Sequence, residues 1–365
     1  MIVIGIDPHK RTHTAVALER ATGELLAERT VQAREQGQGE LLLWARSLAQ
    51  ERVWALEDCR HVSGSLERFL LARGERVVRV PPKLMAGARK GGRSPGKSDA
   101  IDALAVARAY LREPGLPLAF LAGQEREIRL LADHREDLLG ERTRLQNRLR
   151  WDLHDLDPSL EIPPGALDRY CWLDRLQAWL DERDDTSVQV RIARELVARC
   201  RELTRRINEL ERELEALLAY EAEELLCLVG CGTLTAAKLL GEVAGVDRFT
   251  GESKLAKHTG TAPLEVSSGE RQRHRLNRSG NRQLNCALHR IAVTQARIHP
   301  PARAYLERKQ AEGKSRREAL RCLKRHLARV VFNALKERER RKLQERMQET
   351  STAALEPALT YPALT

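Results

Sequence analysis

The sequence predicts an α/β domain followed by a mainly helical chain, so the expected fold class is α/β plus all-α. Short apolar and β-branched runs alternate with helical patterns only in the first third of the chain. Beyond it, leucines repeat every seven residues over long charged segments, the pattern of helices that pack along one seam. The 365 residues fit two or three domains of ordinary size, and 42% hydrophobic residues can fill their cores.

Eight elements are expected in the first domain, in the order βββαβαβα. The strands cover 2–6, 14–18, 25–31, 53–56 and 77–80, and the helices cover 36–50, 63–73 and 98–111. Ser98 is a good N-cap for the last helix. This order, with carboxylates at strand ends and on the last helix, is that of a ribonuclease-H-like domain, expected over residues 1–115. Another kind of small α/β domain is the alternative.

Four acidic residues of this domain have the spacing of a metal-binding set. Asp7 and Glu57 end two strands, and Asp99 and Asp102 stand three residues apart on one helix face. Clustered carboxylates repel one another, and a divalent cation relieves the repulsion. Hard oxygen ligands suit Mg²⁺ or Mn²⁺, and two such ions can stabilise the attacking and departing oxygens of phosphoryl transfer.

Parts of this set have simpler alternatives. Asp99 and Asp102 alone could serve only to stabilise the dipole of their helix. Asp58 competes with Glu57, because a shift of one residue along a strand reverses the face to which a side chain points. Glu57 is preferred because it continues the apolar strand 53–56.

The middle of the chain is expected to be a helical coiled-coil region over residues 116–226. Its helical segments are 124–156 and 187–226, with prolines between them. The leucine repeats are Leu131, Leu138 and Leu145 in the first segment and Leu196, Leu203, Leu210 and Leu217 in the second. Two such segments predict either an antiparallel hairpin within the chain or an intermolecular coiled coil; the oligomer is preferred, since a long helix needs a partner face.

The last domain is expected over residues 227–346 and is mainly helical. Gly230 and Gly232 precede an Ala/Leu-rich helix, which resembles a helix-hairpin-helix whose backbone N–H groups can bind a phosphate. Further basic helices are expected at 281–298 and 315–340. The small, polar, proline-containing tail, 347–365, is expected to be disordered.

Positive charge is concentrated in this last domain. Residues 267–346 carry 23 Lys and Arg against 7 Asp and Glu, whereas the whole chain has a net charge of only +11. Such concentration is typical of a phosphate-binding surface, although a solvated arginine-rich surface is the alternative. The aromatic content of 4% argues against base stacking as the main mode of binding.

A serine-serine-glycine triplet, Ser267-Ser268-Gly269, lies at the start of the basic stretch. A serine in a loop is more often part of a turn than a nucleophile. Arginines surround this one in the sequence, and arginines stabilise the transition state of attack on a phosphate. The arginines are Arg271, Arg273, Arg275, Arg278 and Arg282.

The remaining composition excludes several other classes of protein. The seven cysteines form no CxxC pair and read as reduced thiols, and no apolar run reaches the ~18 residues of a membrane helix. The first residues are too quickly charged to be a signal peptide. We therefore expect a cytoplasmic protein that makes no membrane contact.

Several linked motifs resemble one family along nearly the whole chain: the DEDD transposases of bacterial insertion sequences in the IS one-ten family, related to Piv-type DNA invertases. In the first domain the motifs are Gly5-Ile6-Asp7-Pro8-His9-Lys10, Ala55-Leu56-Glu57 and Lys97-Ser98-Asp99-Ala100-Ile101-Asp102-Ala103. In the last domain they are Val229–Ala236, Gly260-Thr261-Ala262-Pro263, Ser267-Ser268-Gly269 and Asn277-Arg278-Ser279-Gly280-Asn281.

The resemblance implies a RuvC-like domain whose Asp7, Glu57, Asp99 and Asp102 hold Mg²⁺ (or Mn²⁺), and a C-terminal transposase domain whose serine attacks DNA. That serine aligns with Ser268, and Ser267 is the fallback. It also implies a homodimer or homotetramer, an active site combined from two protomers, and a structured bridge RNA that selects donor and target DNA. Lys10 and the arginines above are the expected nucleic-acid contacts.

Two departures from the family pattern are small. Cys231 stands where the family commonly has Ile or Val, and Pro8-His9 is one variant of a loose motif. Neither is expected to touch a catalytic residue.

Three other functions compete with a DNA recombinase. A metal-only nuclease or Holliday-junction resolvase would leave the serine structural. A sugar-kinase or actin-like ATPase can also begin with Ile-Gly-Ile-Asp, but it needs a glycine- and threonine-rich phosphate loop where this chain has Pro8-His9-Lys10. A non-catalytic nucleic-acid-binding protein would not require the carboxylates.

Overall fold

The structure is a computed structural model that forms two compact units. The first holds Met1–Gly123 with Asp247–Thr250, and the second holds the rest of the described chain. The described residues are 1–82, 84–85, 98–113, 115–116, 118–119, 123–183, 185–266, 274–275, 277–278 and 280–355. The predicted nucleophile Ser268 and its fallback Ser267 lie outside the described residues, as do Arg271 and Arg273.

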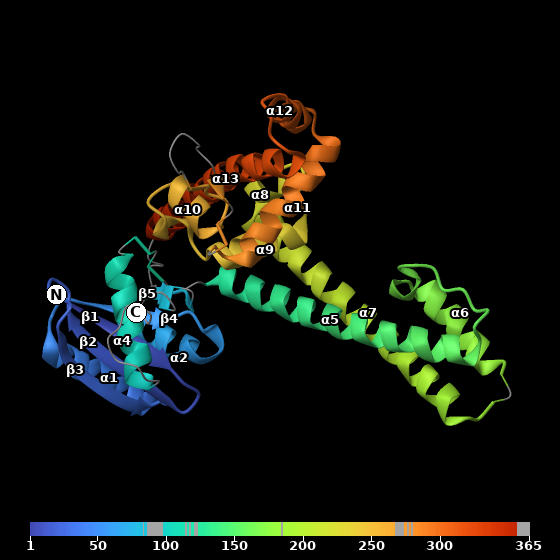
Figure 1. The fold of residues 1–365 in the computed structure, drawn as a ribbon, viewed down its shortest axis with the longest axis horizontal. Helices are drawn as coiled ribbons and strands as arrows, with labels where there is room; N and C mark the ends of the chain where they lie inside the picture. The colour runs from blue at the N-terminus through green and yellow to red at the C-terminus, as the bar shows by residue number, and fades with distance from the viewer. Residues whose placement is uncertain are drawn as a thin grey trace, which may run out of the picture. The chain divides into compact units, whose positions relative to one another are not determined.

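A mixed five-stranded sheet forms the centre of the first unit, with the strand order β3-β2-β1-β4-β5 (Figure 1). The strands are β1 (Ile2–Pro8), β2 (Thr12–Glu19), β3 (Leu25–Gln32), β4 (Arg52–Glu57) and β5 (Val77–Val80). β1 pairs antiparallel with β2 and parallel with β4, and β4 pairs parallel with β5. The first three strands therefore form a meander and the last two join by crossovers, which confirms the predicted ribonuclease-H-like domain.

Helices cover both faces of this sheet. Strand residues alternate between the faces, so Ile4 and Ile6 pack in one core cluster while Val3 packs in another. Helices α1 (Glu35–Leu48) and α2 (Arg60–Leu71) contribute to the first cluster, and α4 (Asp99–Arg112) contributes to the second. The α4 side of the sheet matters most here, because Asp7 shares the face of Val3.

Gly5 sets how closely α4 approaches the sheet. A Cβ atom at this position would lie 2.6 Å from the backbone nitrogen of Ala107 and would also collide with the carbonyl oxygen of Ala103. No side chain fits between β1 and the α4 backbone at that point. The N-terminal turn of α4 is thereby held next to the end of β1.

The second unit begins with a long helical hairpin, α5 (Gln124–Leu156) and α7 (Val188–Glu221), with α6 (Tyr170–Asp181) at its tip (Figure 1). Three of the four predicted seam leucines of α7 are buried, namely Leu196, Leu203 and Leu210, whereas near the end of the helix Leu214 and Leu218 are buried in place of Leu217. α7 packs against α5 of the same chain. Buried Arg142 of α5 donates to the Thr204 hydroxyl of α7 over 3.1 Å. The alternative of an internal hairpin is thus what the structure shows. The apolar seam does not itself require a second copy, and oligomerisation stays a prediction.

The remaining helices pack at the base of this hairpin. They are α8 (Glu223–Leu226), α9 (Thr233–Val243), α10 (Glu252–His258), α11 (Arg282–Ile298), α12 (Pro300–Ala311) and α13 (Arg316–Leu355). Because α5 and α7 both contact α9, the expected division at residue 226 does not separate two compact units. Helix α13 continues to Leu355, so residues 347–355 are helical rather than disordered; residues 356–365 lie outside the described part.

No helix within the described ranges is both long enough and apolar enough to cross a membrane.

Candidate active site

The candidate active site lies where β1 and β4 end, beside the first turn of α4. Asp7 is the next-to-last residue of β1 and is only 4% exposed. It sits on the α4 face of the sheet, and Thr14 lies opposite it on β2. A carboxylate buried this deeply needs a nearby cation or hydrogen-bond donors to remain ionised.

Glu57 is better placed than Asp58 to join Asp7. The parallel register pairs Gly5 with Ala55 and Ile6 with Leu56, so Glu57 follows directly beside Asp7. Glu57 also shares the face of Ala55, which packs in the α4 cluster. Asp58 comes one residue after the end of β4. The register thus favours the predicted Glu57, although its role as a ligand stays a prediction.

Asp99 and Asp102 both lie in the first turn of α4. Ser98 caps this helix as predicted, because its side chain accepts a hydrogen bond from the backbone N–H of Ile101 over 3.3 Å. Asp99 is exposed and Asp102 is half-buried. The helix dipole favours both negative charges at this end. Stabilisation of the dipole and binding of a metal are therefore compatible roles for Asp99 and Asp102.

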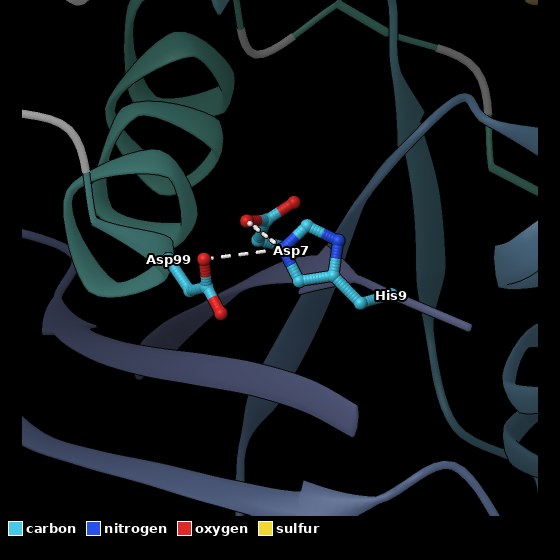
Figure 2. A group of neighbouring side chains, drawn as sticks. All are labelled: Asp7, His9 and Asp99. Atoms are coloured by element: carbon cyan, nitrogen blue, oxygen red, sulfur yellow. Dashed lines mark ion pairs between the residues drawn. The ribbon is translucent and has the colours of Figure 1, made fainter. Parts of the chain in front are cut away.

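His9 lies between two of these carboxylates, as Figure 2 shows. Its Nε2 atom is 3.3 Å from Asp7 Oδ2 and 3.1 Å from Asp99 Oδ1. The hydrogen bond with Asp99 raises the pKa of His9; burial opposes this, and the negative charges of Asp7, Asp99 and Asp102 add to the rise. The expectation that the Pro8-His9 variant touches no catalytic candidate is therefore wrong, since the imidazole contacts two of them.

Cys59 marks the same convergence from the β4 side. The pKa of its thiol is raised to about 11, mainly by burial and in addition by the charges of Glu57, Asp7 and Asp58. Asp7 thus acts on Cys59 together with Glu57, and on His9 together with Asp99 and Asp102. Asp7 and Asp99 therefore meet at His9, while the register places Glu57 beside Asp7 and Asp102 lies in the same first turn of α4 as Asp99.

The donor set at this point fits a divalent cation. Ligand atoms of Asp7, His9 and Asp99 all lie within 4.8 Å of one another. Carboxylate oxygens are the ligands that Mg²⁺ and Mn²⁺ prefer, and an imidazole is acceptable to Mn²⁺. The ring of His9 lies where a cation would contact both aspartates. The group Asp7, His9 and Asp99 can therefore hold a metal ion; sequence reasoning missed His9, and the predicted ligands Glu57 and Asp102 stay predictions.

The serine segment, residues 267–273, falls in the range of the second unit, and hydrogen-bonded strands flank it on both sides. The short strands β6 (Leu264–Glu265) and β7 (His274–Arg275) pair antiparallel, so the chain leaves and re-enters the described structure at adjacent points. Gly260 has φ +68°, and a Cβ there would lie 2.9 Å from the carbonyl oxygen of Asn277. A Cβ on Gly280 would lie 2.7 Å from the carbonyl carbon of Thr259.

Gly260 and Gly280 are therefore required because the backbones of their two segments are in contact. Asn281 completes the frame: its side chain caps α11 by accepting from the N–H of Leu284 over 3.0 Å, and its amide donates to Glu242 over 2.5 Å. The motifs Gly260–Pro263 and Asn277–Asn281 thus fix the chain on both sides of the serine segment.

The other predicted nucleic-acid contacts are exposed. Lys10 lies just after β1, Arg275 lies on β7, Arg278 precedes Gly280, and Arg282 begins α11. The glycine turn before α9 has a structural function in addition to any contact with phosphate. Gly230 has φ +85°, and a Cβ there would lie 3.0 Å from Thr294 of α11.

Two family profiles match the chain. Residues 4–158 match a profile described as a transposase of the DEDD IS110 type, and residues 222–307 match one described as transposase IS116/IS110/IS902 family. The first match contains all four carboxylates and the second contains the serine segment.

Insertion-element proteins align over nearly the whole length. An IS116 protein of Streptomyces clavuligerus is 30% identical over 92% of this chain and 95% of its own length. An IS900 protein of Mycobacterium paratuberculosis is 26% identical over 91% and 95%. Among solved structures, Thermus thermophilus RuvC in complex with Holliday junction substrate aligns with 33% of this chain and 99% of its own, at 18% identity and a TM-score of 0.26.

Proposed function

The chain belongs to the IS116/IS110/IS902 family of transposases, and from this premise we propose that it cuts and rejoins DNA at insertion-sequence ends and at a target with a carboxylate-held metal and a serine nucleophile. The observation that supports the proposal is the meeting of Asp7 and Asp99 at His9, at one edge of a ribonuclease-H-like sheet, with Glu57 next to Asp7 in the strand register and Asp102 in the same helix turn as Asp99. Carboxylates at such an edge are suited to phosphoryl transfer.

In this mechanism Asp7, Glu57, Asp99 and Asp102 would hold the divalent cation. When bound, the cation supplies positive charge that stabilises the oxygens of the phosphate under attack. Asp7 would provide a well-ordered ligand because it lies within β1, and the Ser98 cap stabilises the helix turn that carries Asp99 and Asp102. His9 contacts Asp7 and Asp99 and would share their negative charge with the cation.

Ser268 is the proposed nucleophile, with Ser267 as the fallback. Its Oγ would form a bond to phosphorus while the bond from phosphorus to a strand oxygen breaks, and the departing oxygen would take up a proton. The phosphoserine linkage conserves the energy of the broken bond, so attack by another strand's hydroxyl can rejoin the DNA without ATP or another external source of energy. Arginines beside the serine would stabilise the charge of the transition state.

The test compares Ser268→Ala, Asp7→Asn and the control Ser253→Ala on DNA that carries the element's ends. We expect both site variants to lose strand cleavage by at least about 10³-fold, since each removes a member of the catalytic set. The control should cleave like the wild type. Retained cleavage by Ser268→Ala would instead support a metal-dependent nuclease or resolvase with a structural serine.

A covalent intermediate provides an independent readout. Wild-type protein incubated with labelled DNA should yield a protein–DNA adduct that survives denaturation, and peptide mapping should find it on Ser268. An adduct on Ser267 would change the assignment by one residue. The absence of any adduct during productive cleavage would overturn the nucleophile.

We extend the proposal to a guide RNA and to two-protomer catalysis, on the strength of the family. Mixing Asp7→Asn protein with Ser268→Ala protein should restore cleavage if one protomer supplies the acids and its partner supplies the serine. RNA extracted from the purified protein should contain a discrete transcript from the DNA beside the gene. No restored cleavage and only random RNA would contradict these two extensions without affecting the chemistry.

A further inference from the structure

A large pocket lies in the second unit, within residues that the acidic site does not use. Its volume is about 1100 Å³, and it is bordered by the Gly260–Pro263 turn, by α12 and by the N-terminal half of α13. Val266 and His274, which precede and follow the serine segment, also line it. This volume is at the upper end of typical ligand sites, so the pocket can accommodate something larger than a single small anion.

The lining of the pocket is strongly cationic. Among the described residues of the lining, only Glu312 and Glu318 oppose the six positive side chains Arg275, Lys309, Lys314, Arg321, Lys324 and Arg325. Both acids are engaged locally. Glu312 pairs with Lys309 at 2.7 Å, and Glu318 accepts hydrogen bonds from the backbone N–H and the hydroxyl of Ser315.

Two exposed cations of the pocket are therefore available to a ligand. Neither Lys314 nor Arg321 forms an ion pair with a carboxylate in the described part of the chain. Like charges gathered around one cavity raise the free energy of the empty protein, and an anion in the cavity would lower it.

Lys324 is a buried residue of the pocket lining, and a hydrogen bond holds its side chain in place. It is only 8% exposed, and its Nζ donates to Asn285 Oδ1 over 2.6 Å. The amide of Asn285 in turn donates to the carbonyl of Thr259, at the turn that fixes the entry to the serine segment, over 2.9 Å. The ammonium group is thus positioned before any ligand binds, so little conformational entropy is lost on binding.

The pKa of His326 indicates the same positive potential. The pKa of Lys324 is lowered mainly by burial; Cys286 opposes this change, and the charge of Arg321 adds to it. Burial also lowers the pKa of His326, followed by the charges of Arg329, Arg325, Lys309 and Arg308.

An aromatic wall accompanies the cations. Tyr305 of α12 and His326 of α13 both line the pocket, and their rings meet edge to face with centroids 5.0 Å apart. A nucleic-acid strand carries bases as well as charged phosphates, and a base can stack on an aromatic ring at this side of the pocket.

We propose that this pocket binds the phosphodiester backbone of a nucleic-acid strand, with Lys324 as a preset anchor and Lys314 and Arg321 as the cations that close on the phosphates. The inference rests on the proposed function only in taking nucleic acid as the ligand. It needs no metal and does not involve the carboxylates of the first unit, so the pocket would hold a strand whether or not cleavage follows.

The test uses full-length protein in EDTA and a fluorescein-labelled single strand, measured by anisotropy, with DNA and RNA as separate arms. The variant is Lys314→Gln/Arg321→Gln, which changes only exposed side chains. The matched control is Arg206→Gln/Arg212→Gln, which removes the same charge from exposed positions of α7, outside the pocket.

We expect the pocket variant to bind about 10-fold more weakly than the control, with a salt dependence reduced by about 1.4 in slope, because each single-strand phosphate contact contributes ~0.7. Weakening with one kind of strand identifies DNA or RNA as the ligand, and weakening with both identifies the backbone alone. Binding within twofold of the control for both strands would overturn the proposal.

Two further variants separate this proposal from the catalytic one. Lys324→Gln, shown to be folded by its thermal melt, should weaken binding at least as much as the double variant. Asp7→Asn should bind like the wild type in EDTA while losing cleavage. Protein that binds through the pocket but never cleaves DNA would leave this inference standing and the proposed function refuted.

Discussion

At the scale of single residues, His9 is the feature that most changes the view of the acidic site. Its Nε2 atom contacts Asp7 and Asp99 in the place where a cation would lie (Figure 2). The sequence contained a usable signal, because residues two apart along a strand share a face, and His9 is two residues from Asp7. The signal is weak because His9 comes after the apolar residues of the strand and one residue beyond its end at Pro8.

Replacing His9 by alanine tests this placement. His9→Ala removes the donor between two carboxylates, so we expect a lower melting temperature than the wild type in EDTA. Millimolar Mg²⁺ should stabilise the variant more than the wild type, because the cation no longer displaces the imidazole. Thermal melts with and without Mg²⁺ measure both effects. Equal Mg²⁺-induced shifts in the two proteins would show that the ring and the metal do not share a place.

Glu75 is the residue whose titration bears most on the stability of the first unit. Its carboxylate accepts hydrogen bonds from Arg52 over 2.6 and 2.7 Å and from the indole of Trp54 over 3.0 Å. Burial acts to raise the pKa of Glu75, but the bonds from Arg52 and Trp54 outweigh it and the net pKa is lowered. A lowered pKa adds stability that is present above the unfolded-state pKa and lost as the pH falls through the folded-state value.

Glu75→Gln should therefore destabilise the protein by about 3 kcal/mol at neutral pH, the cost of removing one partner from a buried ion pair. The difference from the wild type should shrink as the pH drops below ~4.3, the ordinary value for a glutamate. Denaturant unfolding at a series of pH values measures this. A difference independent of pH would show that packing, and not charge, is what Glu75 provides.

The residues that sequence alone identified were those tied to a regular pattern. Asp7 and Glu57 end apolar strands, and Ser98 precedes a helix, so their places followed from the periodicity. The choice between Glu57 and Asp58 needed the register of β1 with β4. The roles of Gly260 and Gly280 could not be predicted, because they depend on contact between two segments about twenty residues apart in the chain.

At the scale of elements, the approach of α4 to β1 decides whether the acidic residues meet. Gly5→Ala should destabilise the first unit by about 3 kcal/mol, since its Cβ collides with the α4 backbone. Gly39→Ala is the matched control: nothing lies within 4 Å of its Cβ in α1, and alanine should stabilise that helix by roughly 0.5–1 kcal/mol. Chemical denaturation measures both, and equal effects would contradict the close approach.

Helices that depend on tertiary contacts were the ones that the pattern did not reveal. α12 begins with Pro300 and Pro301, which a helix accepts in its first turn but which look like a break in the sequence. α6 follows a proline-rich stretch in the same way. α7 was expected to reach residue 226 and ends at Glu221, whose carbonyl is taken by the buried side chain of Arg338 over 2.5 Å.

At the scale of the whole molecule, two compact units should unfold separately. Each has its own buried ion pair, Glu75–Arg52 in the first and Arg338–Glu221 in the second, the latter at 2.6 Å. Arg338 is 1% exposed, so Arg338→Met should cost about 3–5 kcal/mol by leaving Glu221 buried with one cation fewer.

Differential scanning calorimetry should therefore resolve two transitions. Gly5→Ala should lower one of them, and Arg338→Met should lower only the other. A single transition that both variants shift together would mean that the units unfold as one cooperative body.

The length of the α5/α7 hairpin can change without a change in the elements at its base. With 33 residues, α5 extends about 50 Å from the helices that pack at its base to α6 at its tip. Because the seam repeats every seven residues, removing one repeat from both helices would shorten the arm by about 10 Å and leave every remaining seam contact in register. The length of this arm can thus be adjusted in evolution, or by engineering, in steps of seven residues that leave the acidic residues of β1, β4 and α4 unchanged.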